Sequence, residues 1–355
     1  MNLKSHRNRI IAEDLAAITA APLPWEALSG STVLVTGAAG FLPAYMVETI
    51  LYLNDSRFIE KARVIALVRN VERARERFAA YLDRGDFEIV VQDVSAPLTV
   101  AGPVDYVIHA ASQASPVYYR TDPVGTLSAN VLGTRNLLAA AQNHAMKGFL
   151  FFSSGEIYGI VKNDSKPVAE HDGGFLDPTD VRSCYGESKR MGETMCVAWA
   201  HQFGVPTRIV RPFHTYGPGM RLDDGRVFAD FVRDILKGGP IVLKSDGAAR
   251  RSFCYLADAT LGFFTVLLNG KNGEAYNIAN PEGECSIAEL ADRLAAEFKD
   301  EGMTVERQVR ADKNYFTSSI VSTKPDIGKA QSLGWKIEHT IEQGFRRTVE
   351  SYREL

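Results

Sequence analysis

Residues 32–43 read TVLVTGAAGFLP, an apolar run that passes through Gly37 and Gly40 into a helical stretch. Glycines at such a turn let the backbone bend sharply, so that its N–H groups can approach a pyrophosphate at the N-terminus of the helix. In a doubly wound sheet, a dinucleotide binds at this first strand–helix turn. An ordinary strand–helix loop is the alternative, because a glycine-rich turn alone is a weak signal. Pro43 stands where a third glycine is usual, and it is compatible with the first turn of a helix.

Strand-like apolar runs and helical stretches alternate from residue 31 to residue 210. The runs lack the polar alternation of a half-exposed strand, which favours a parallel sheet covered by helices on both faces. We therefore expect an α/β fold: a Rossmann-type doubly wound parallel sheet with a smaller C-terminal substrate-binding lobe. The expected division is an N-terminal helical extension over 1–29, an NAD(P)-binding Rossmann domain over 30–211, and a mainly substrate-binding lobe over 212–355 with some segments returning to the sheet.

The composition excludes several classes of protein. Forty Lys and Arg residues oppose 43 Asp and Glu residues, a formal net charge of −3, so no basic excess predicts a nucleic-acid partner. No run of 18 apolar residues is present, and the N-terminus lacks the apolar region of a signal peptide, so we expect no membrane partner. No cluster of His, Cys and carboxylate residues has metal-ligand spacing. Widely spaced cysteines without a CxxC pair are typical of reduced thiols in a cytoplasmic protein. These cysteines are Cys184, Cys196, Cys254 and Cys285.

The choice of cofactor depends on Arg69 and Asp93, which follow the expected second and third strands. Arg69 stands where an acidic residue would hydrogen-bond the adenosine ribose of NAD. Arg69 could receive the 2′-phosphate of NADP, stack on adenine, or simply be a solvated arginine at the start of a charged helix. Asp93 is a candidate for an adenine contact. These residues leave NAD and NADP both open.

Four residues form a candidate catalytic group. Tyr185 and Lys189 are four positions apart and share one face of an expected helix. A phenol, with an ordinary pKa of about 10, is a poor base at neutral pH, but a nearby ammonium and an oxidised nicotinamide would favour the phenolate. Tyr185 could then be the acid/base for a sugar hydroxyl, although a surface Tyr–Lys pair is the alternative. Ser154 and Glu156 follow a buried strand, where α/β sheets carry their chemistry. Ser154 could bond the same hydroxyl, and Glu156 could be a second acid/base or a rim carboxylate.

The glycine turn, the strand-end serine and the Tyr-x-x-x-Lys pair, in this order and spacing, resemble the extended short-chain dehydrogenase/reductase family of NAD(P)-dependent nucleotide-sugar epimerases and dehydratases. The resemblance spans roughly residues 30–350. Within that family the chain looks most like UDP-glucuronate decarboxylases. It implies tightly held NAD(P), with NAD favoured by the family and NADP possible through Arg69, a nucleotide-diphospho-sugar substrate, and a cytoplasmic homodimer. The matching stretches lie at 114–123, 184–196, 217–227, 251–253, 277–281 and 324–335.

The resemblance also implies roles for single residues. Arg251 would touch the diphosphate or the reacting end of the sugar, and Arg226 the nucleotide, although both could be surface ion-pair partners. His214 would be a neutral hydrogen-bond donor that titrates near neutral pH, or else a core histidine. The catalytic residues would be Ser154, Glu156, Tyr185 and Lys189. The cofactor would contact Gly37, Gly40, Phe41, Leu42, Arg69, Asp93, Val94, Ala110, Ala111, Tyr185 and Lys189. The substrate would contact Tyr119, His214, Arg226 and Arg251.

Three departures surround the expected substrate. Gly155 precedes Glu156, where decarboxylases have Ser and glucose 4,6-dehydratases have Asp; we expect Gly155 to leave space near C5–C6 of the sugar. His214 replaces an Asn, and Ser322-Thr323 stands where arginine precedes Pro-Asp. Glu156 would face the carboxylate of a glucuronate, and Arg251 would offset the repulsion.

The resemblance fixes the first chemical step better than the second. Oxidation at C4 is common to the family. The 4-keto sugar could then lose CO2, which we favour, or undergo 4,6-dehydration or 4-epimerisation. A catalytically silent cofactor-binding protein is a remote alternative. In the expected dimer, helix 130–142 and the helix of Tyr185 would form the interface, unless their apolar residues face the sheet. These residues are Leu137, Leu138, Met191 and Met195.

Overall fold

The structure is a computed structural model, and it describes residues 8–100, 102–142, 145–161, 166–223, 225–308 and 324–354. Within these ranges a seven-stranded sheet runs in the order β10-β6-β5-β4-β1-β2-β3, and every neighbouring pair is parallel. The order reverses between β1 and β4, which is the point where a doubly wound sheet binds its ligand. The strands are β1 (Thr32–Thr36), β2 (Arg63–Val68), β3 (Phe87–Val91), β4 (Tyr106–His109), β5 (Gly148–Phe152), β6 (Thr207–Pro212) and β10 (Glu274–Ile278).

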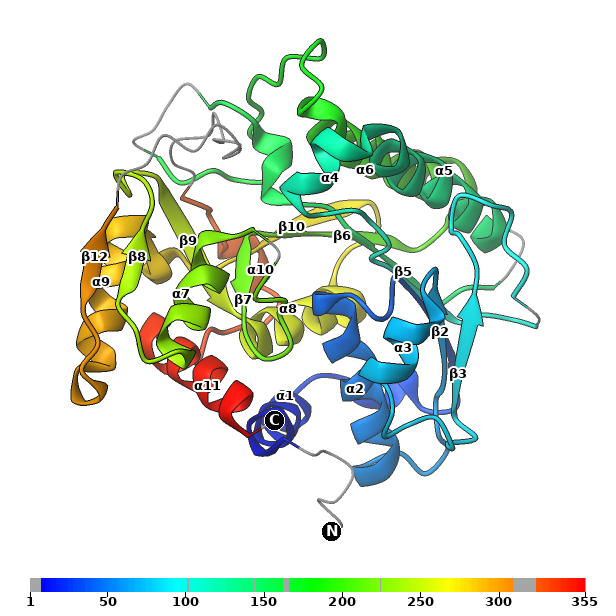
Figure 1. The fold of residues 1–355 in the computed structure, drawn as a ribbon. Helices are drawn as coiled ribbons and strands as arrows, with labels where there is room; N and C mark the ends of the chain where they lie inside the picture. Colours follow the sequence, from blue (N-terminus) through cyan, green and yellow to red (C-terminus); the bar gives the residue numbers. More distant parts are fainter. Residues whose placement is uncertain are drawn as a thin grey trace.

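Helices cover both faces of this sheet (Figure 1). Val33 and Val35 of β1 lie in one buried cluster, whereas Leu34 between them lies in another. Because alternate residues of a strand point to opposite faces, each cluster fills one side of the sheet. This arrangement confirms the predicted Rossmann-type doubly wound sheet. The helices are α1 (Arg9–Ala20), α2 (Phe41–Ser56) and α8 (Leu256–Asn269) in the first cluster, and α5 (Pro123–Gln142) and α6 (Ser183–Phe203) in the second.

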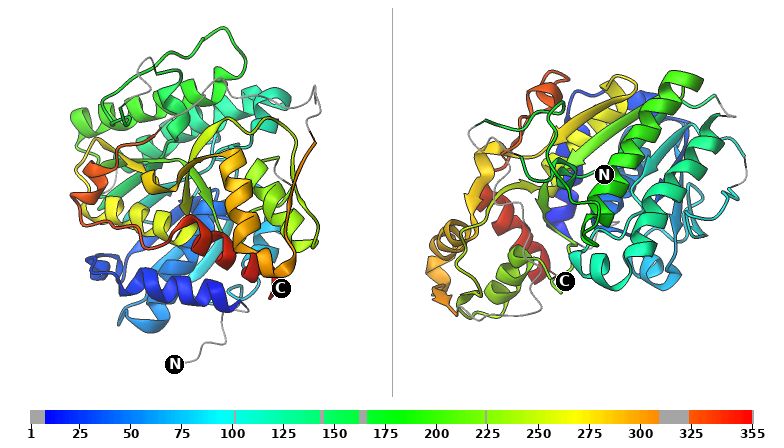
Figure 2. Two further views of the ribbon diagram at one scale, coloured as in Figure 1. Left: turned by 90° about the vertical axis from the view of Figure 1, so that its left-hand side faces the viewer. Right: turned by 90° about the horizontal axis from the view of Figure 1, so that it is seen from above.

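A smaller lobe follows residue 212 and lies to one side of the sheet (Figure 2). Two segments beyond that residue, β10 and α8, belong instead to the central layers. The domain boundaries at 29/30 and 211/212 stay a prediction. The strands of the lobe are β7 (His214–Tyr216), β8 (Ile241–Leu243), β9 (Arg250–Tyr255), β11 (Glu284–Ser286) and β12 (Val305–Arg307). Its helices are α7 (Val227–Leu236), α9 (Ile287–Glu297) and α11 (Ile341–Arg353), whereas α10 (Gly328–Gln331) packs against β10 and α8.

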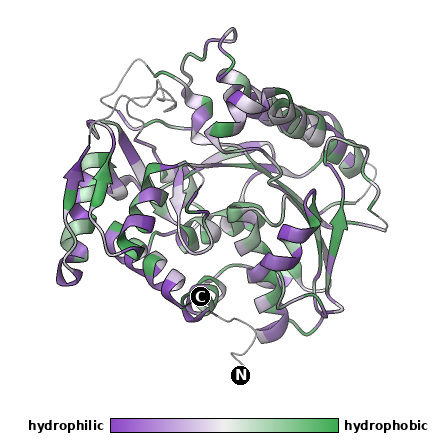
Figure 3. Ribbon diagram, viewed as in Figure 1, coloured by the Kyte–Doolittle hydropathy of each residue, from purple (hydrophilic) through white to green (hydrophobic). Residues whose placement is uncertain are grey.

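The remaining helices are short, and α3 among them lies at the surface. It is hydrophilic, whereas the neighbouring strand β3 is hydrophobic (Figure 3). Only Ala74 of α3 is buried, because this helix lies at the surface. No described helix is long and apolar enough to cross a membrane. The short helices are α3 (Val71–Arg77) and α4 (Pro116–Thr121), and the 3-10 helices η2 (Trp25–Leu28), η3 (Gly155–Tyr158), η4 (Pro281–Gly283) and η5 (Lys299–Glu301).

Helix α1 is anchored by a buried carboxylate. Asp14 accepts hydrogen bonds from the hydroxyls of Tyr45 (3.0 Å) and Tyr255 (2.6 Å) and from the guanidinium of Arg347 (2.6 Å). These partners come from α2, β9 and α11. The predicted N-terminal extension is therefore packed against the sheet layer and against the last helix.

Two of the residues expected at a dimer interface lie inside the protomer. Leu137 and Leu138 of α5 are 1% and 0% exposed and pack in the second cluster, so the expectation that they contact a partner is wrong. A helix that is apolar on most sides gives no clear signal for which side meets the sheet. Met195 is partly buried against the same cluster, and Met191 is 49% exposed.

Candidate active site

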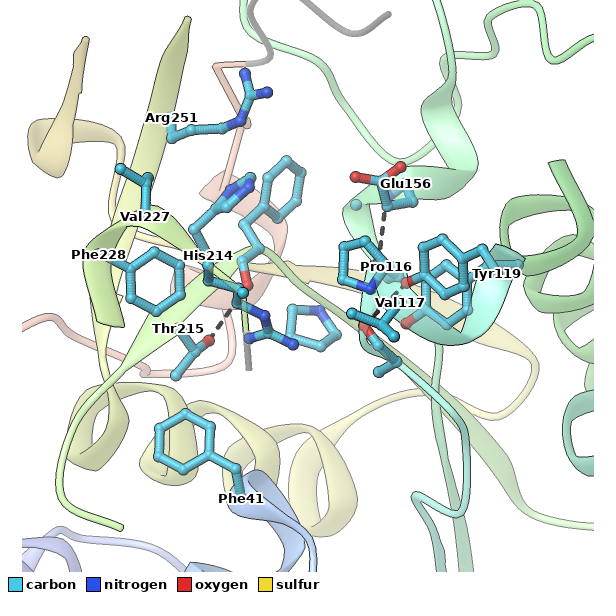
Figure 4. Close-up of a pocket in the computed structure, with 18 of the residues that line it drawn as sticks. Phe41, Pro116, Val117, Tyr119, Glu156, His214, Thr215, Val227, Phe228 and Arg251 are labelled. Atoms are coloured by element: carbon cyan, nitrogen blue, oxygen red, sulfur yellow. Dashed lines mark hydrogen bonds between the residues drawn. The ribbon is translucent and has the colours of Figure 1, made fainter. Parts of the chain in front are cut away.

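A cavity of about 800 Å³ lies between the sheet and the lobe. Figure 4 shows Tyr119 and Glu156 on one side of it and His214, Val227 and Arg251 on the other, with Phe41 below. All eight residues predicted to be catalytic or to bind substrate line this cavity: Ser154, Glu156, Tyr185, Lys189, Tyr119, His214, Arg226 and Arg251. The structure thus brings together side chains from the sheet edge, from α6 and from the lobe.

A second cavity of about 180 Å³ lies beside the first, because Gly40 and Ser112 line both. The predicted cofactor residues divide between the two. The smaller cavity is lined by Gly37, Gly40, Arg69, Asp93, Val94 and Ala111. The larger cavity is lined by Gly40, Phe41, Leu42, Ala110, Tyr185 and Lys189.

The glycine turn at the switch point is closely packed. Gly37 has φ +65°, and a Cβ there would lie 2.7 Å from the Cα of Ala111 at the end of the neighbouring strand. Glycine is therefore the residue that this turn permits. Gly40 caps α2, and Pro43 lies in the first turn of that helix, as expected.

These cavities fit a dinucleotide. The hydroxyls of Ser112 and Ser153 are buried and have no hydrogen-bond partner within the part of the chain that the structure describes. Buried hydroxyls are normally paired, so both point to an absent polar ligand. Both serines line the larger cavity, and Ser112 lines the smaller one as well. In the lining of the smaller cavity, Nη1 of Arg69 lies 3.7 Å from Oδ2 of Asp93, and both side chains are about half exposed.

Tyr185 and Lys189 share a face of α6 but do not bond to each other. The Lys189 ammonium donates to the carbonyl oxygen of Phe152 (2.6 Å) and lies 5.8 Å from the centre of the Tyr185 ring. Burial lowers the pKa of Lys189 to about 7. Burial also raises the pKa of Tyr185 to about 12, although a hydrogen bond with Ser154 opposes this rise. Without cofactor the phenol is therefore protonated at neutral pH.

Tyr119 supports the ring of Tyr185. The two rings stack with their centres 4.8 Å apart and an angle of 17° between their planes. The Tyr119 hydroxyl donates to the carbonyl oxygen of Ala114 (2.9 Å). The prediction for Tyr119 is a substrate contact. Its stacking on Tyr185 does not follow from sequence spacing, because the two residues belong to separate helices, α4 and α6.

Glu156 has an arginine neighbour that sequence reasoning missed. The backbone N–H of Glu156 donates to the hydroxyl of Ser154 (3.2 Å), which caps η3. Nη2 of Arg182 lies 3.5 Å from Oε2 of Glu156. Arg182 precedes Tyr185 by three positions, so the two share a helical face. That spacing is the signal that could have found it.

The space expected beside Gly155 is filled. A Cβ built on Gly155 would lie 2.9 Å from both Cδ1 and Cε1 of Phe213, a separation too short for carbon atoms. The prediction that Gly155 leaves room near the sugar is therefore wrong. An aromatic wall stands there instead, because Phe213 lines the same cavity.

The opposite side of the cavity is basic. Burial, and then the charges of Arg251 and Arg226, hold the pKa of His214 well below its ordinary value. The imidazole is therefore neutral at pH 7, and the expectation that it titrates near neutral pH is wrong. A Nη1 atom of Arg251 donates to the carbonyl oxygen of Arg250 (2.7 Å). Arg251 and the neutral His214 lie on this side (Figure 4), and Arg226 is within electrostatic range of both His214 and Tyr185. The two guanidinium groups suit a diphosphate.

Two further predictions concern Ser322-Thr323 and metal binding. Ser322-Thr323 lies outside the described residues. In the described ranges, no group of three His, Cys, Asp or Glu side chains is placed to hold a metal ion.

The chain is similar to proteins of known activity. A model of the NAD dependent epimerase/dehydratase family matches residues 33–279. The chain is 34% identical to UDP-glucuronic acid decarboxylase 6 of Arabidopsis thaliana, across 92% of this chain and 90% of that protein. It is 32% identical to UDP-glucuronic acid decarboxylase 1 of Xenopus tropicalis, across 90% of this chain and 72% of that protein.

Solved structures share the fold. UDP-glucuronic acid 4-epimerase from Bacillus cereus, in complex with UDP-glucuronic acid and NAD, has a TM-score of 0.74 at 22% identity, over 91% of this chain and 99% of that chain. A dTDP-glucose 4,6-dehydratase from Streptomyces venezuelae, with NAD bound, has a TM-score of 0.73 at 25% identity, over 91% of this chain and 97% of that chain.

Proposed function

Because the chain belongs to the NAD dependent epimerase/dehydratase family, we propose that it oxidises C4 of UDP-glucuronate and decarboxylates the resulting 4-keto sugar. The products are CO2 and a UDP-pentose. One observation carries the proposal: Glu156 and Tyr185 line the same cavity as the basic side chains, and Arg251 lies across that cavity from Glu156 (Figure 4). The 34% identity to a UDP-glucuronic acid decarboxylase over 92% of the chain supports the choice of reaction.

Bound NAD would supply the hydride acceptor for oxidation at C4 and the hydride donor for the reduction that follows loss of CO2. The turn at Gly37 and Gly40 would hold its pyrophosphate, and the unpaired hydroxyls of Ser112 and Ser153 would bond to it. We favour NAD over NADP because the carboxylate of Asp93 lies beside Arg69 and would repel a 2′-phosphate.

Tyr185 would accept the proton of the C4 hydroxyl, and Ser154 would orient that hydroxyl. The phenol has to lose its proton before it can accept one from the C4 hydroxyl, and its raised pKa requires a positive charge nearby. The oxidised nicotinamide ring would supply that charge. Ser154 is already bonded to the phenol and would hold the sugar hydroxyl in line with it.

Decarboxylation then needs no further redox step. The C5–C6 bond breaks, its electron pair moves onto the C4 carbonyl oxygen as an enolate, and CO2 leaves. C5 takes a proton as the carbonyl reforms, and Glu156 would be the group that relays this proton from water. Arg226, Arg251 and His214 would hold the nucleotide diphosphate on the opposite side of the cavity.

A second candidate reaction is 4-epimerisation of the same sugar. The observation that favours it is the apolar ring of Phe213 in the place of the hydroxyl that decarboxylases carry before the glutamate. If CO2 were retained, the hydride would return to the other face of the C4 ketone.

One incubation separates the candidates. The NAD-loaded protein is incubated with UDP-glucuronate, and the molecular masses of the products are determined by mass spectrometry. A loss of 44 Da, the mass of CO2, supports decarboxylation, and an unchanged mass with a new C4 configuration by NMR supports epimerisation. UDP-glucose tests dehydration through a loss of 18 Da, the mass of water. No conversion of UDP-glucuronate would refute the proposal.

We also propose a cytoplasmic homodimer. Several apolar side chains on α5 and α6 are 39–69% exposed, and a partner would cover them. The four cysteines are free thiols, which suits the cytoplasm. Light scattering at micromolar concentration tests the dimer, and a monomer would refute it. The exposed side chains are Val124, Leu127, Leu132, Met191 and Val197.

A further inference from the structure

Arg182 lies beside Glu156 in the wall of the larger cavity, and the proposed mechanism does not use it. It precedes α6, and its backbone N–H donates to Oδ1 of Asp180 (2.9 Å). Its side chain is 15% exposed and lines the cavity. The guanidinium is therefore held in the cavity wall instead of extending into solvent.

The two ends of this guanidinium have different surroundings. Nη2 faces Oε2 of Glu156 at 3.5 Å, a long contact. Nη1 is buried and has no hydrogen-bond partner anywhere in the described ranges. A buried charged donor without an acceptor is costly to a folded protein. Its presence in a cavity wall indicates that a ligand supplies the acceptor.

The position of Arg182 identifies that acceptor. The diphosphate has a basic wall of its own, and Arg251 of that wall lies across the cavity from Glu156 (Figure 4). Arg182 instead lies beside Glu156, on the side where the sugar would react. The anionic group of UDP-glucuronate that remains for this side is the C6 carboxylate. A guanidinium fork matches a carboxylate in shape and charge.

We propose that Arg182 binds the C6 carboxylate of the sugar through Nη1 and thereby selects uronic acid substrates over neutral sugars. This inference rests on the proposed function. With its other end on Glu156, Arg182 also separates two carboxylates that would otherwise repel each other. Arg182, not Arg251, then offsets that repulsion.

The test compares ligands that differ only in this carboxylate. UDP-xylose has the same hydroxyl configuration as UDP-glucuronate and no C6 group. The NAD-loaded protein is assayed for its KM with UDP-glucuronate and for its inhibition constant with UDP-xylose. Arg182→Gln should raise the KM by about 10- to 100-fold and leave the inhibition constant unchanged. Arg182→Lys should give a smaller rise, because an ammonium cannot bridge two carboxylates as a fork can.

Arg346→Gln is the matched control, because Arg346 pairs with Glu297 away from the cavity. It should leave both constants unchanged. Equal weakening of both ligands by Arg182→Gln would mean a structural role and would overturn the inference, as would no effect on either. If Arg182→Gln fails to fold, the same comparison is made with Arg182→Lys.

Failure of the proposed function gives a different result. In that case the wild-type protein releases no CO2 from UDP-glucuronate. Calorimetric binding of UDP-glucuronate and UDP-glucose to the wild type and to Arg182→Gln then still tests the carboxylate site. Selective loss of UDP-glucuronate affinity supports the inference, and equal loss overturns it.

Discussion

The ring of Phe213 occupies the place of a side chain at position 155, since a Cβ on Gly155 would lie 2.9 Å from two of its carbon atoms. The two residues come from separate parts of the chain: Gly155 begins η3 after β5, and Phe213 lies between β6 and β7. The pair therefore couples the position of Glu156, next in sequence to Gly155, to the start of the lobe.

This coupling predicts the effect of restoring a hydroxyl. Gly155→Ser should destabilise the protein by about 1–3 kcal/mol, because the new Cβ meets an aromatic ring. The double variant Gly155→Ser/Phe213→Leu should recover part of the loss, and urea unfolding measures both. Gly173→Ser is the control, since nothing lies within 4 Å of a Cβ at Gly173. A neutral Gly155→Ser would contradict the packing described.

Removal of the Tyr185 hydroxyl should stop catalysis without disturbing the cofactor. Tyr185→Phe keeps the ring that stacks on Tyr119 but deletes the group that accepts the O4 proton. Turnover of UDP-glucuronate should fall by about 100- to 10,000-fold. NAD affinity, measured by fluorescence titration, should stay close to that of the wild type. Retention of most of the turnover would remove Tyr185 from the mechanism.

Tyr119 can be assigned by comparing two variants. If its ring orients Tyr185, Tyr119→Leu should lower kcat by about tenfold or more, and Tyr119→Phe should keep most of it. If its hydroxyl contacts the substrate, Tyr119→Phe should instead raise KM. Steady-state kinetics with UDP-glucuronate distinguishes the two. An equal loss of kcat in both variants would contradict the stacking role.

The buried Lys189 predicts a pH dependence of stability. Its folded pKa of about 7 lies below the ordinary value of 10.5. Between these values the unfolded chain binds the extra proton, so the free energy of unfolding rises with pH, by up to about 1.4 kcal/mol per unit. In cofactor-free protein, the wild type should gain stability relative to Lys189→Met from pH 7 to pH 9, measured by urea unfolding. A constant difference across that range would show that Lys189 titrates normally.

The pair of Arg69 and Asp93 predicts the choice of cofactor. The wild type should bind NAD more tightly than NADP, and Asp93→Asn should improve NADP binding by removing the repelling carboxylate. Arg69→Ala should weaken NADP more than NAD, by about 1.5–3 kcal/mol, if Arg69 contacts the 2′-phosphate. Titration with both cofactors measures this. Equal effects on the two cofactors would take that role from Arg69.

Local patterns predicted the parts of the site that depend on neighbouring residues. The turn at Gly37 and the shared helical face of Tyr185 and Lys189 both follow from short-range geometry. The pairs Tyr119–Tyr185 and Gly155–Phe213 do not, because each joins elements that meet only when the tertiary structure forms.

The burial of Leu137 and Leu138 and the charge state of His214 also depend on tertiary contacts. Of the two positions that the sequence leaves open for Leu137 and Leu138, the structure shows the one inside the protomer, since an apolar helix can bury several of its sides. The charge state of His214 depends on burial and on two arginines from other elements, and neither is visible in the residues around it.

The anchoring of α1 has a consequence for the order in which the chain folds during synthesis. Asp14 is made near the start, but its cation, Arg347, follows 333 positions later. Until α11 emerges from the ribosome, the carboxylate of Asp14 lacks the guanidinium of Arg347. A chain that stops before Arg347 would therefore keep the tyrosine bonds to Asp14 but lack its cation, and α1 would be held less firmly.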